Sequence, residues 1–124
     1  MPDATPTLLV ADDDPAVRQS LERTLAREGY QVVLAPDGQA AAERLRQGGV
    51  DLLLSDLRMP GLTGLELLRE VKTAHPDVDV IMLTAFGTVE EAVAAMKDGA
   101  VDFLTKPFQR AQLIRVIRKA LERR

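Results

Sequence analysis

The stretch from Leu52 to Gly64 limits the fold of this chain more than any other. It reads Leu-Leu-Leu-Ser-Asp-Leu-Arg-Met-Pro-Gly-Leu-Thr-Gly. The uncharged apolar run that ends at Asp56 predicts a strand buried on both faces, as in a parallel sheet. A carboxylate at the carboxyl end of such a strand lies where open α/β sheets carry their chemistry, although Asp56 alone fits a turn cap equally well.

Four more apolar runs alternate with helical patterns along the chain. Strands are expected at residues 8–11, 31–35, 50–55, 80–83 and 101–105. Helices are expected after Asp14-Pro15, after Asp37-Gly38, from Thr63 or Gly64 to His75, from Thr88 to Gly99, and from about Gln109. Alternating strands and helices with short connections predict one α/β domain, a parallel sheet with helices on both faces.

Composition removes several classes of function. A chain of 124 residues is long enough for one core, and the absence of cysteine excludes disulfides and thiolate metal sites, which suits a reducing cytoplasm. No apolar run approaches the roughly 18 residues of a membrane span. The net charge of -3 argues against nucleic acid as the main partner. The cations of the last helix, Arg115, Arg118, Lys119, Arg123 and Arg124, are attributed to helix-end solvation rather than DNA binding.

Polar residues stand where four of these strands end. They are Asp12 and Asp13, Asp56, Thr84, and Lys106. Because the carboxyl ends of parallel strands share one edge of a sheet, we expect these side chains to meet in one crevice. Each residue by itself has an ordinary explanation: an acidic turn, a β-branched strand residue or an exposed loop charge.

Clustered carboxylates repel one another unless a cation neutralises them. The available ligands are all oxygens, which selects Mg2+ rather than zinc or copper. A metal beside a carboxylate, an ammonium and a hydroxyl suits phosphoryl transfer, with Asp56 as the nucleophile that becomes an aspartyl phosphate. Lys106 and Thr84 would then contact the phosphoryl oxygens. No residue is placed as a dedicated base, so the site is expected to receive a phosphoryl group rather than turn over a substrate.

Three other functions remain open at this point. A Mg2+-dependent phosphatase or mutase with an aspartate nucleophile usually has a second carboxylate two residues later, where this chain has Arg58. A flavin-binding electron carrier would need hydroxyls and glycines after the first strand, where three aspartates would repel the phosphate. A module of the same fold that accepts no phosphoryl group and acts only through protein contacts is the third alternative.

The same residues carry a resemblance to a known family. The motifs Leu-Val-Ala-Asp-Asp-Asp-Pro, Ser-Asp-Leu-Arg-Met-Pro-Gly-Leu-Thr-Gly, Met-Leu-Thr-Ala-Phe-Gly and Phe-Leu-Thr-Lys-Pro-Phe resemble receiver domains of bacterial two-component response regulators. The likeness runs from Leu8 to Leu121. The stretch from Thr84 to Phe108 is similar to the NtrC family of sigma-54-dependent activators. The resemblance implies a flavodoxin-like (βα)5 fold with strand order 2-1-3-4-5, and a cis peptide bond before Pro107.

The resemblance also implies individual roles. Asp56 would be the phosphoacceptor, and Mg2+ would be held by Asp12, Asp13, Asp56 and the backbone carbonyl of Arg58. Lys106 would contact the phosphoryl group, while Thr84 and Phe103 would form the switch. Phe103 lacks the hydroxyl of the more common tyrosine, and Thr63 stands where aspartate is frequent. Neither departure removes a reacting group.

Partners follow from the same resemblance. A sensor histidine kinase would phosphorylate Asp56, and Thr84 would draw the loop at residues 85–87 toward the phosphoryl group while Phe103 turns. The face formed by the helix at 88–99, the strand at 101–105 and the last helix would then change and control an output domain or homodimerisation. Val89, Met96 and Ile114 are nevertheless expected to pack in the core. Residues 1–7 are expected to be a loose lead-in and 8–122 the receiver domain, with the output domain outside this sequence.

Overall fold

Five parallel strands form one sheet in the order β2-β1-β3-β4-β5. The computed structural model describes residues 5–85 and 88–122. Along the chain the elements are β1 (Thr7–Ala11), α1 (Pro15–Arg27), β2 (Gln31–Ala35), α2 (Gly38–Arg46), β3 (Leu52–Asp56), α3 (Gly64–Ala74), β4 (Asp79–Thr84), α4 (Val89–Lys97), β5 (Asp102–Thr105) and α5 (Arg110–Glu122). The predicted fold and strand order are confirmed.

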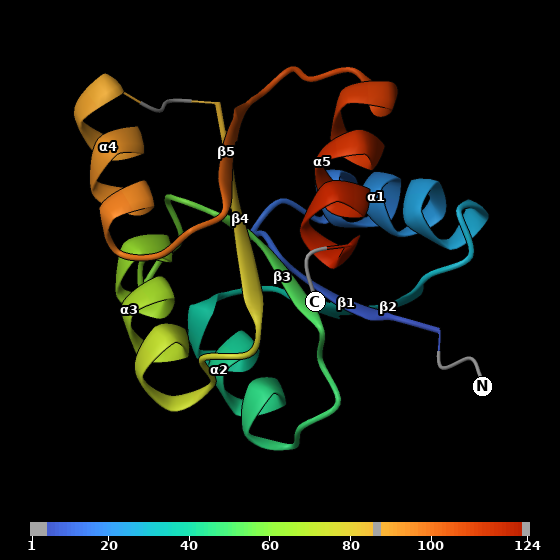
Figure 1. Cartoon of the computed structure of the whole chain (residues 1–124). Coiled ribbons are helices and arrows are strands. Elements are labelled where there is room, and N and C mark those ends of the chain that lie inside the picture. The colour runs from blue at the N-terminus through green and yellow to red at the C-terminus, as the bar shows by residue number, and fades with distance from the viewer. Residues whose placement is uncertain (1–4, 86–87, 123–124) are drawn as a thin grey trace.

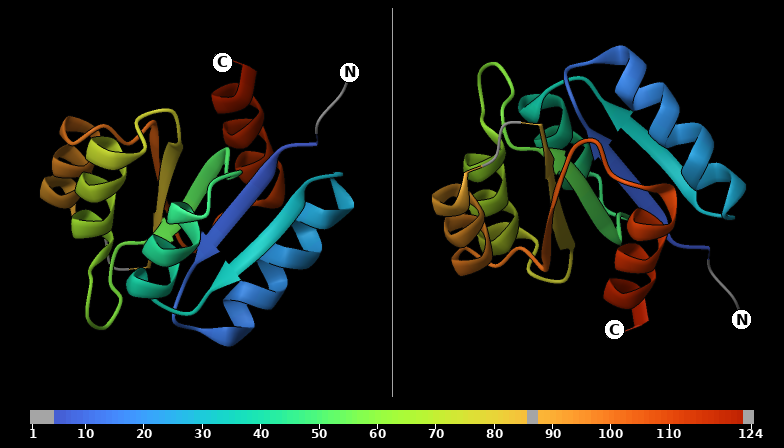
Figure 2. Two further views of the ribbon diagram at one scale, coloured as in Figure 1. Left: turned by 90° about the horizontal axis from the view of Figure 1, so that it is seen from below. Right: turned by 90° about the horizontal axis from the view of Figure 1, so that it is seen from above.

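Helices cover both faces of the sheet, α1 and α5 on one face and α2, α3 and α4 on the other (Figures 1 and 2). Neighbouring residues of a strand point to opposite faces, so each strand supplies two cores. Leu53 packs toward α2 and α3, whereas Leu52 and Leu54 pack toward α1 and α5. All three are fully buried, as expected for a central strand of a parallel sheet.

Helix starts follow the capping chemistry that the sequence predicts. Asp14 caps α1 by accepting a hydrogen bond from the Ala16 N–H, with Pro15 as the first helical residue. Thr88 and Glu91 form the expected capping box of α4. Thr63 caps α3 in the same way with Glu66, whose side chain accepts from the Thr63 N–H, and this hydrogen bond lowers the pKa of Glu66.

Several element boundaries differ from expectation by one or two residues. β1 begins at Thr7, because the Thr7 N–H donates to Asp51 Oδ2 at 2.8 Å and its carbonyl accepts from the Asp51 N–H. β3 runs from Leu52 to Asp56 rather than from Val50, which places Asp56 as the last residue of the strand. The loop expected at residues 85–87 falls mostly on residues 86 and 87, which lie outside the described part of the chain.

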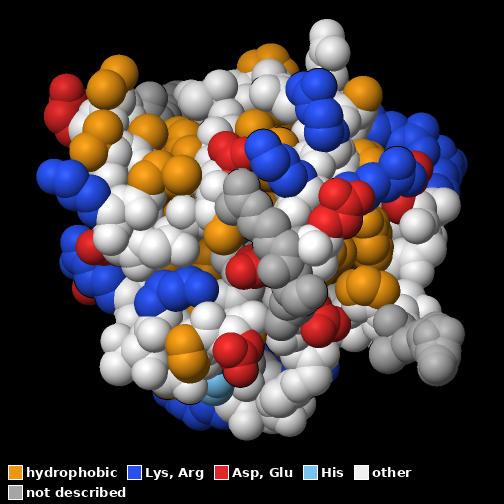
Figure 3. Space-filling view, viewed as in Figure 1, with side chains coloured by type: hydrophobic (Ala, Val, Ile, Leu, Met, Phe, Trp, Pro, Cys, Tyr) orange, Lys and Arg blue, Asp and Glu red, His pale blue; other side chains and the backbone are white. Residues whose placement is uncertain are grey.

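The expectation that Val89 and Met96 pack in the core is wrong. Val89 is 76% exposed, and Val93 and Met96 are each 47% exposed. The helix instead turns Ala95 toward the sheet, where it is fully buried. Small side chains allow α4 to lie close to the sheet and leave the large apolar residues outside, where apolar side chains gather over α4 in Figure 3. Ile114 on α5 is buried, as expected.

No described helix has both the length and the apolar character needed to cross a membrane.

Candidate functional site

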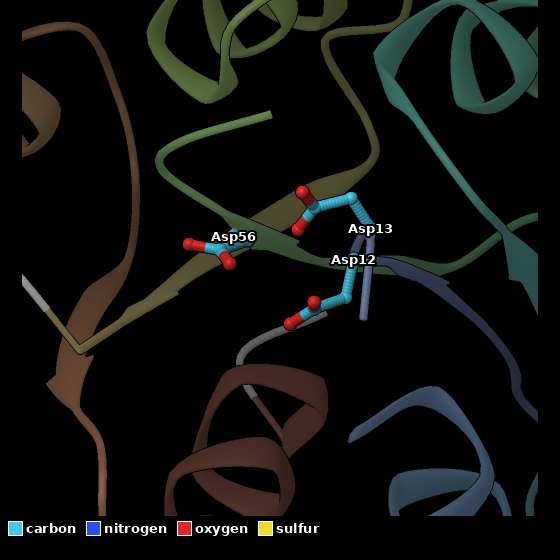
Figure 4. Close-up of side chains that lie close together, drawn as sticks. All are labelled: Asp12, Asp13 and Asp56. Carbon is cyan, nitrogen blue, oxygen red and sulfur yellow. The ribbon is translucent and has the colours of Figure 1, made fainter. Parts of the chain in front are cut away.

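Three carboxylates meet at the carboxyl edge of the sheet, between its two central strands. Asp56 ends β3, and Asp12 and Asp13 directly follow β1. The register pairs Ala11 with Ser55, so the two strands end side by side. Each of the three side chains offers an oxygen within 4.8 Å of the others. Figure 4 shows the side chains of Asp12 and Asp13 extending from the end of β1 toward the side of Asp56, which lies at the end of β3. The predicted convergence of these acids is therefore observed.

Asp12 is fixed by its own loop. Its side chain is only 2% exposed, and Oδ1 accepts a hydrogen bond from the Asp14 N–H at 2.9 Å. Its backbone carbonyl accepts from Arg18 Nη1 at 2.6 Å, which ties the loop to the first turn of α1. Asp13 is exposed at the mouth of the site. The loop thus presents one buried and one open carboxylate.

The Lys106 side chain extends from the end of β5 to the carboxylates at the ends of β1 and β3. Its Nζ lies 2.6 Å from Asp12 Oδ2 and 3.4 Å from Asp56 Oδ2. Its backbone N–H donates to the Thr84 carbonyl at 2.8 Å, which holds the end of β5 beside the end of β4. The Lys106–Pro107 peptide bond is cis, as the family resemblance implies.

Burial and neighbouring charges shift the pKa values of both central groups. Burial, reinforced by the charge of Asp12, raises the pKa of Asp56, although the Lys106 charge and the Arg58 N–H oppose the shift. Burial by itself would lower the pKa of Lys106. The hydrogen bond and charge of Asp12, together with the charge of Asp56, outweigh burial and raise that pKa, so the ammonium stays charged at neutral pH.

The residues present fit a hard divalent cation. All the donors are oxygens, and three carboxylates with one ammonium leave two uncompensated negative charges, which one divalent ion neutralises. Mg2+ keeps several water ligands and needs only one or two carboxylates from a protein. The open position of Asp13 allows such an ion to enter with its water.

The remaining predicted residues lie around this centre. Thr84 ends β4 and is 1% exposed, and because Leu83 pairs with Asp56 in the register, Thr84 follows directly beyond the acid. Phe103 lies on β5, half-buried against the core on the α2–α4 face. The backbone N–H of Arg58 donates to Asp56 Oδ1 at 3.3 Å. These positions agree with the expected convergence, and the roles of the residues stay predictions.

Two supports of the site were not predicted from the sequence. Ser55 is fully buried, and its hydroxyl donates to the Asp56 carbonyl at 2.9 Å. Gly64, the first residue of α3, approaches that carbonyl so closely that a Cβ would lie 2.7 Å from Leu57 Cα and collide with the Asp56 oxygen. Its place in the motif and at a helix start was visible in the sequence, but the packing partner was not.

We expect Asp56→Asn to stabilise the magnesium-free protein at neutral pH. A raised pKa means that the charged carboxylate is less stable in the folded protein than in the unfolded chain. Replacing Asp56 by asparagine therefore increases the free energy of unfolding at neutral pH. The gain should shrink as the pH falls from the raised pKa of Asp56 in the folded protein toward its ordinary value of 3.8 in the unfolded chain, because below both values the carboxyl is protonated in both states. Urea unfolding in EDTA at about pH 7 and about pH 4 measures this difference.

Asp14→Asn is the matched control for that measurement. Asp14 is exposed, belongs to the same acidic run, and caps α1 through a hydrogen bond that asparagine also makes. Its free energy of unfolding should stay close to that of the unmodified protein at both pH values. An Asp56→Asn gain that persisted unchanged at the lower pH would contradict the prediction.

The sheet order and the acidic edge define a class, the flavodoxin-like α/β domains with a cluster of carboxylates suited to a cation at the end of the central strands. The model of the response regulator receiver domain family matches residues 8–118. The chain belongs to this family. The resemblance predicted from the motifs is therefore confirmed, and the family is one of signalling domains rather than a recognised class of enzymes.

Relatives of known name are longer than this chain. The response regulator MprA of Mycobacterium leprae is 43% identical over 116 residues, which are 94% of this chain and 51% of that protein. The transcriptional regulatory protein GlrR of Escherichia coli K12 is 43% identical over 115 residues, which are 93% of this chain and 26% of that protein. The chain thus spans about half of one relative and about a quarter of the other.

Two solved receiver domains, named NtrX and NtrC4, are similar to this chain over nearly its whole length. The receiver domain of NtrX from Brucella abortus is 37% identical with a TM-score of 0.88, covering 93% of this chain and 98% of that one. The beryllofluoride-activated NtrC4 receiver domain dimer is 32% identical with a TM-score of 0.90, covering 94% of this chain and 97% of that one. Together with GlrR, these relatives agree with the predicted likeness to the NtrC family.

Proposed function

We propose that this domain is a signalling switch of a two-component system that accepts a phosphoryl group on Asp56. One observation carries the proposal: Lys106 places its ammonium between the half-buried Asp56 and the buried Asp12, at the edge where Thr84 also ends its strand. A carboxylate nucleophile, a cation and a hydroxyl are the groups that phosphoryl transfer to an aspartate requires. A sensor histidine kinase is the proposed donor.

In the proposed transfer an Asp56 carboxylate oxygen attacks phosphorus. The new P–O bond forms as the P–N bond to the donor histidine breaks, and the imidazole keeps the electron pair and takes a proton from water. Lys106 offsets the negative charge on the phosphoryl oxygens. Mg2+, held by Asp12, Asp13, Asp56 and the Arg58 carbonyl, would supply further charge neutralisation when bound. The domain assists its own phosphorylation and dephosphorylation and is not a turnover enzyme.

The proposed switch couples Thr84 and Phe103 to the phosphoryl group. Thr84 donates its hydroxyl to a phosphoryl oxygen, and Phe103 turns into the space that this movement opens. Moving the active population from about 1% to 99% takes roughly 5.5 kcal/mol. A few hydrogen bonds to a charged group, each contributing about 1.5–3 kcal/mol, are sufficient.

We expect Thr84→Ala to take up the phosphoryl group and yet lose the change on the α4–β5–α5 face, because the acceptor is intact while the hydroxyl is missing. Thr84→Ser should retain the response. Thr105→Ala is the matched control, since Thr105 is the exposed partner of Thr84 in the register of β4 and β5. Sedimentation with and without beryllofluoride measures the response, and an undiminished response in Thr84→Ala would remove Thr84 from the switch.

The proposed output surface is the face of α4, β5 and α5. Val89, Val93 and Met96 form an exposed apolar stripe on α4, and basic side chains lie over α5 (Figure 3). The NtrC4 neighbour is described as a beryllofluoride-activated dimer. We propose that phosphorylation promotes homodimerisation through this face.

We assign residues 8–122 to the receiver domain of a cytoplasmic regulator, and Thr7, expected in the lead-in, joins the domain as the first residue of β1. GlrR, which is named a transcriptional regulatory protein, extends well beyond the matched region. An output domain that regulates transcription, of the sigma-54-dependent type, is the proposed target of the switch. This receiver domain itself would bind neither nucleic acid nor membrane.

The direct test is a mass measurement after incubation with acetyl phosphate. A gain of one phosphoryl group that requires Mg2+ is expected. Continuous release of phosphate over many turnovers would favour a phosphatase or mutase instead. No gain with any phosphodonor, together with retained partner binding, would identify a domain that acts only by protein contact.

A further inference from the structure

Helix α4 buries little apolar surface, and ion pairs join both of its ends to the rest of the domain. Among its described residues only Ala95 is buried. Two ion pairs join the helix to other elements, one near each end. Arg58 Nη2 lies 2.9 Å from Glu91 Oε1 in the first turn, and Arg69 Nε lies 2.8 Å from Asp98 Oδ2 at the C-cap. A helix with so little buried apolar surface is easily moved when one of these pairs changes.

The pair near the first turn begins at the candidate site. Arg58 stands two residues after Asp56, and its backbone N–H already contacts Asp56 Oδ1. Its Nη2 lies 2.9 and 3.1 Å from the two carboxylate oxygens of Glu91. Arg58, Glu91 and Asp13 line one open hollow of about 450 Å³. The Arg58 side chain is therefore exposed along a hollow that it shares with Asp13, the open carboxylate of the site.

Glu91 has a second contact that ties it to the start of the helix. Its Oε1 accepts a hydrogen bond from the Thr88 N–H at 3.0 Å, while the Thr88 hydroxyl accepts from the Glu91 N–H. Thr88 lies four residues after Thr84 in the connection between β4 and α4. A change at Glu91 therefore acts on both the helix cap and the end of this connection.

We propose that Arg58 is a charge-responsive latch between the phosphorylation site and α4. With Asp56 unmodified, the guanidinium holds Glu91 and the first turn of α4. Phosphorylation of Asp56 adds a group with a charge of about −1.5 to −2 and three acceptor oxygens, which arginine binds in bidentate fashion. The phosphoryl group then competes with the single charge of Glu91, and α4 is released. This inference rests on the proposed function of Asp56.

The expected size of the effect follows from exposure. The Arg58 and Glu91 side chains are 54% and 26% exposed. Exposed ion pairs of this kind change an equilibrium by about two- to fivefold. The latch thus tunes the switch, and the phosphoryl contacts of Lys106 and Thr84 supply the larger part.

Glu91→Gln, Arg58→Gln and the double variant form the test. Glutamine at position 91 keeps the capping box but lacks the charge that holds Arg58. We expect Glu91→Gln to raise the steady-state labelling by acetyl phosphate about two- to fivefold, because the carboxylate of Glu91 then no longer competes with the phosphoryl group for Arg58. In the Arg58→Gln background the same change should have no effect. Asp98→Asn, which breaks the pair at the other end of α4, should leave the labelling unchanged.

A second measurement follows the guanidinium directly. The Arg58 Nε–H resonance should shift when beryllofluoride is added, while that of Arg69, which donates to Asp98, stays in place. An unmoved Arg58 resonance, or a Glu91→Gln gain that persists without Arg58, overturns the latch while Asp56 labelling remains normal. Failure of the unmodified protein to take up any phosphoryl group overturns the proposed function and the latch together.

Discussion

Asp56→Asn is expected to reduce hydroxylamine-labile labelling by acetyl phosphate to background. An aspartyl phosphate is an acyl phosphate, which hydroxylamine cleaves, and asparagine has no anionic oxygen to attack phosphorus. No other carboxylate of the cluster has the same surroundings, since Asp12 is buried against Lys106 and Asp13 is exposed on the loop after β1. Intact-mass analysis and peptide mapping after the reaction measure the loss.

The control for this prediction is Asp14→Asn, which changes one carboxyl group in the same acidic run and keeps the cap of α1. Its labelling should remain close to that of the unmodified protein. If label persisted in Asp56→Asn, mapping would show which residue carries it, and the assignment of Asp56 as the acceptor would be wrong.

Lys106→Met is expected to lower the free energy of unfolding by about 3 kcal/mol when magnesium is absent. The ammonium contacts the carboxylate of Asp12, which is 2% exposed, and its loss leaves that charge buried beside Asp13 and Asp56. Mg2+ should restore much of the stability, because the divalent ion neutralises the same carboxylates. Urea unfolding in EDTA and in excess Mg2+ measures both effects.

Lys97→Met is the matched control, since Lys97 is exposed in the last turn of α4, where the chain has returned to the amino-terminal edge of the sheet, opposite the acidic cluster. Its unfolding should be nearly unchanged and should depend on magnesium as in the unmodified protein. An equally small effect of Lys106→Met would mean that Asp12 does not depend on the ammonium for its charge balance. Labelling of Lys106→Met should also fall, because Lys106 offsets charge on the phosphoryl oxygens.

The sequence predicted the fold because each strand is a short apolar run that stands between two helical patterns. The run from Leu52 to Leu54 has no polar residue, which only a strand covered on both faces tolerates. The convergence of Asp12, Asp56 and Lys106 then followed from topology, since all parallel strands end at one edge. Resemblance added the order of the strands, which spacing does not determine.

Packing between distant segments was not available from these patterns. The apolar spacing of Val89, Val93 and Met96 predicts a buried stripe, but Ala95 is the one described residue of this helix that is buried. Arg58 and Glu91 are 33 residues apart, and each has an ordinary local explanation as a loop charge and a capping residue. Their pairing depends on how α4 is placed, which local sequence does not specify.

The contact between Gly64 and the Asp56 carbonyl also distinguishes α3 from α4, because it fixes the start of α3 to the site. Because α3 starts directly against the backbone of Asp56, the proposed phosphoacceptor, the helix and this residue cannot separate without unpacking the core. Any displacement that begins at Asp56 must therefore be taken up on the opposite side of the crevice. The close contact at Gly64 thus directs a change at Asp56 away from α3 and toward α4.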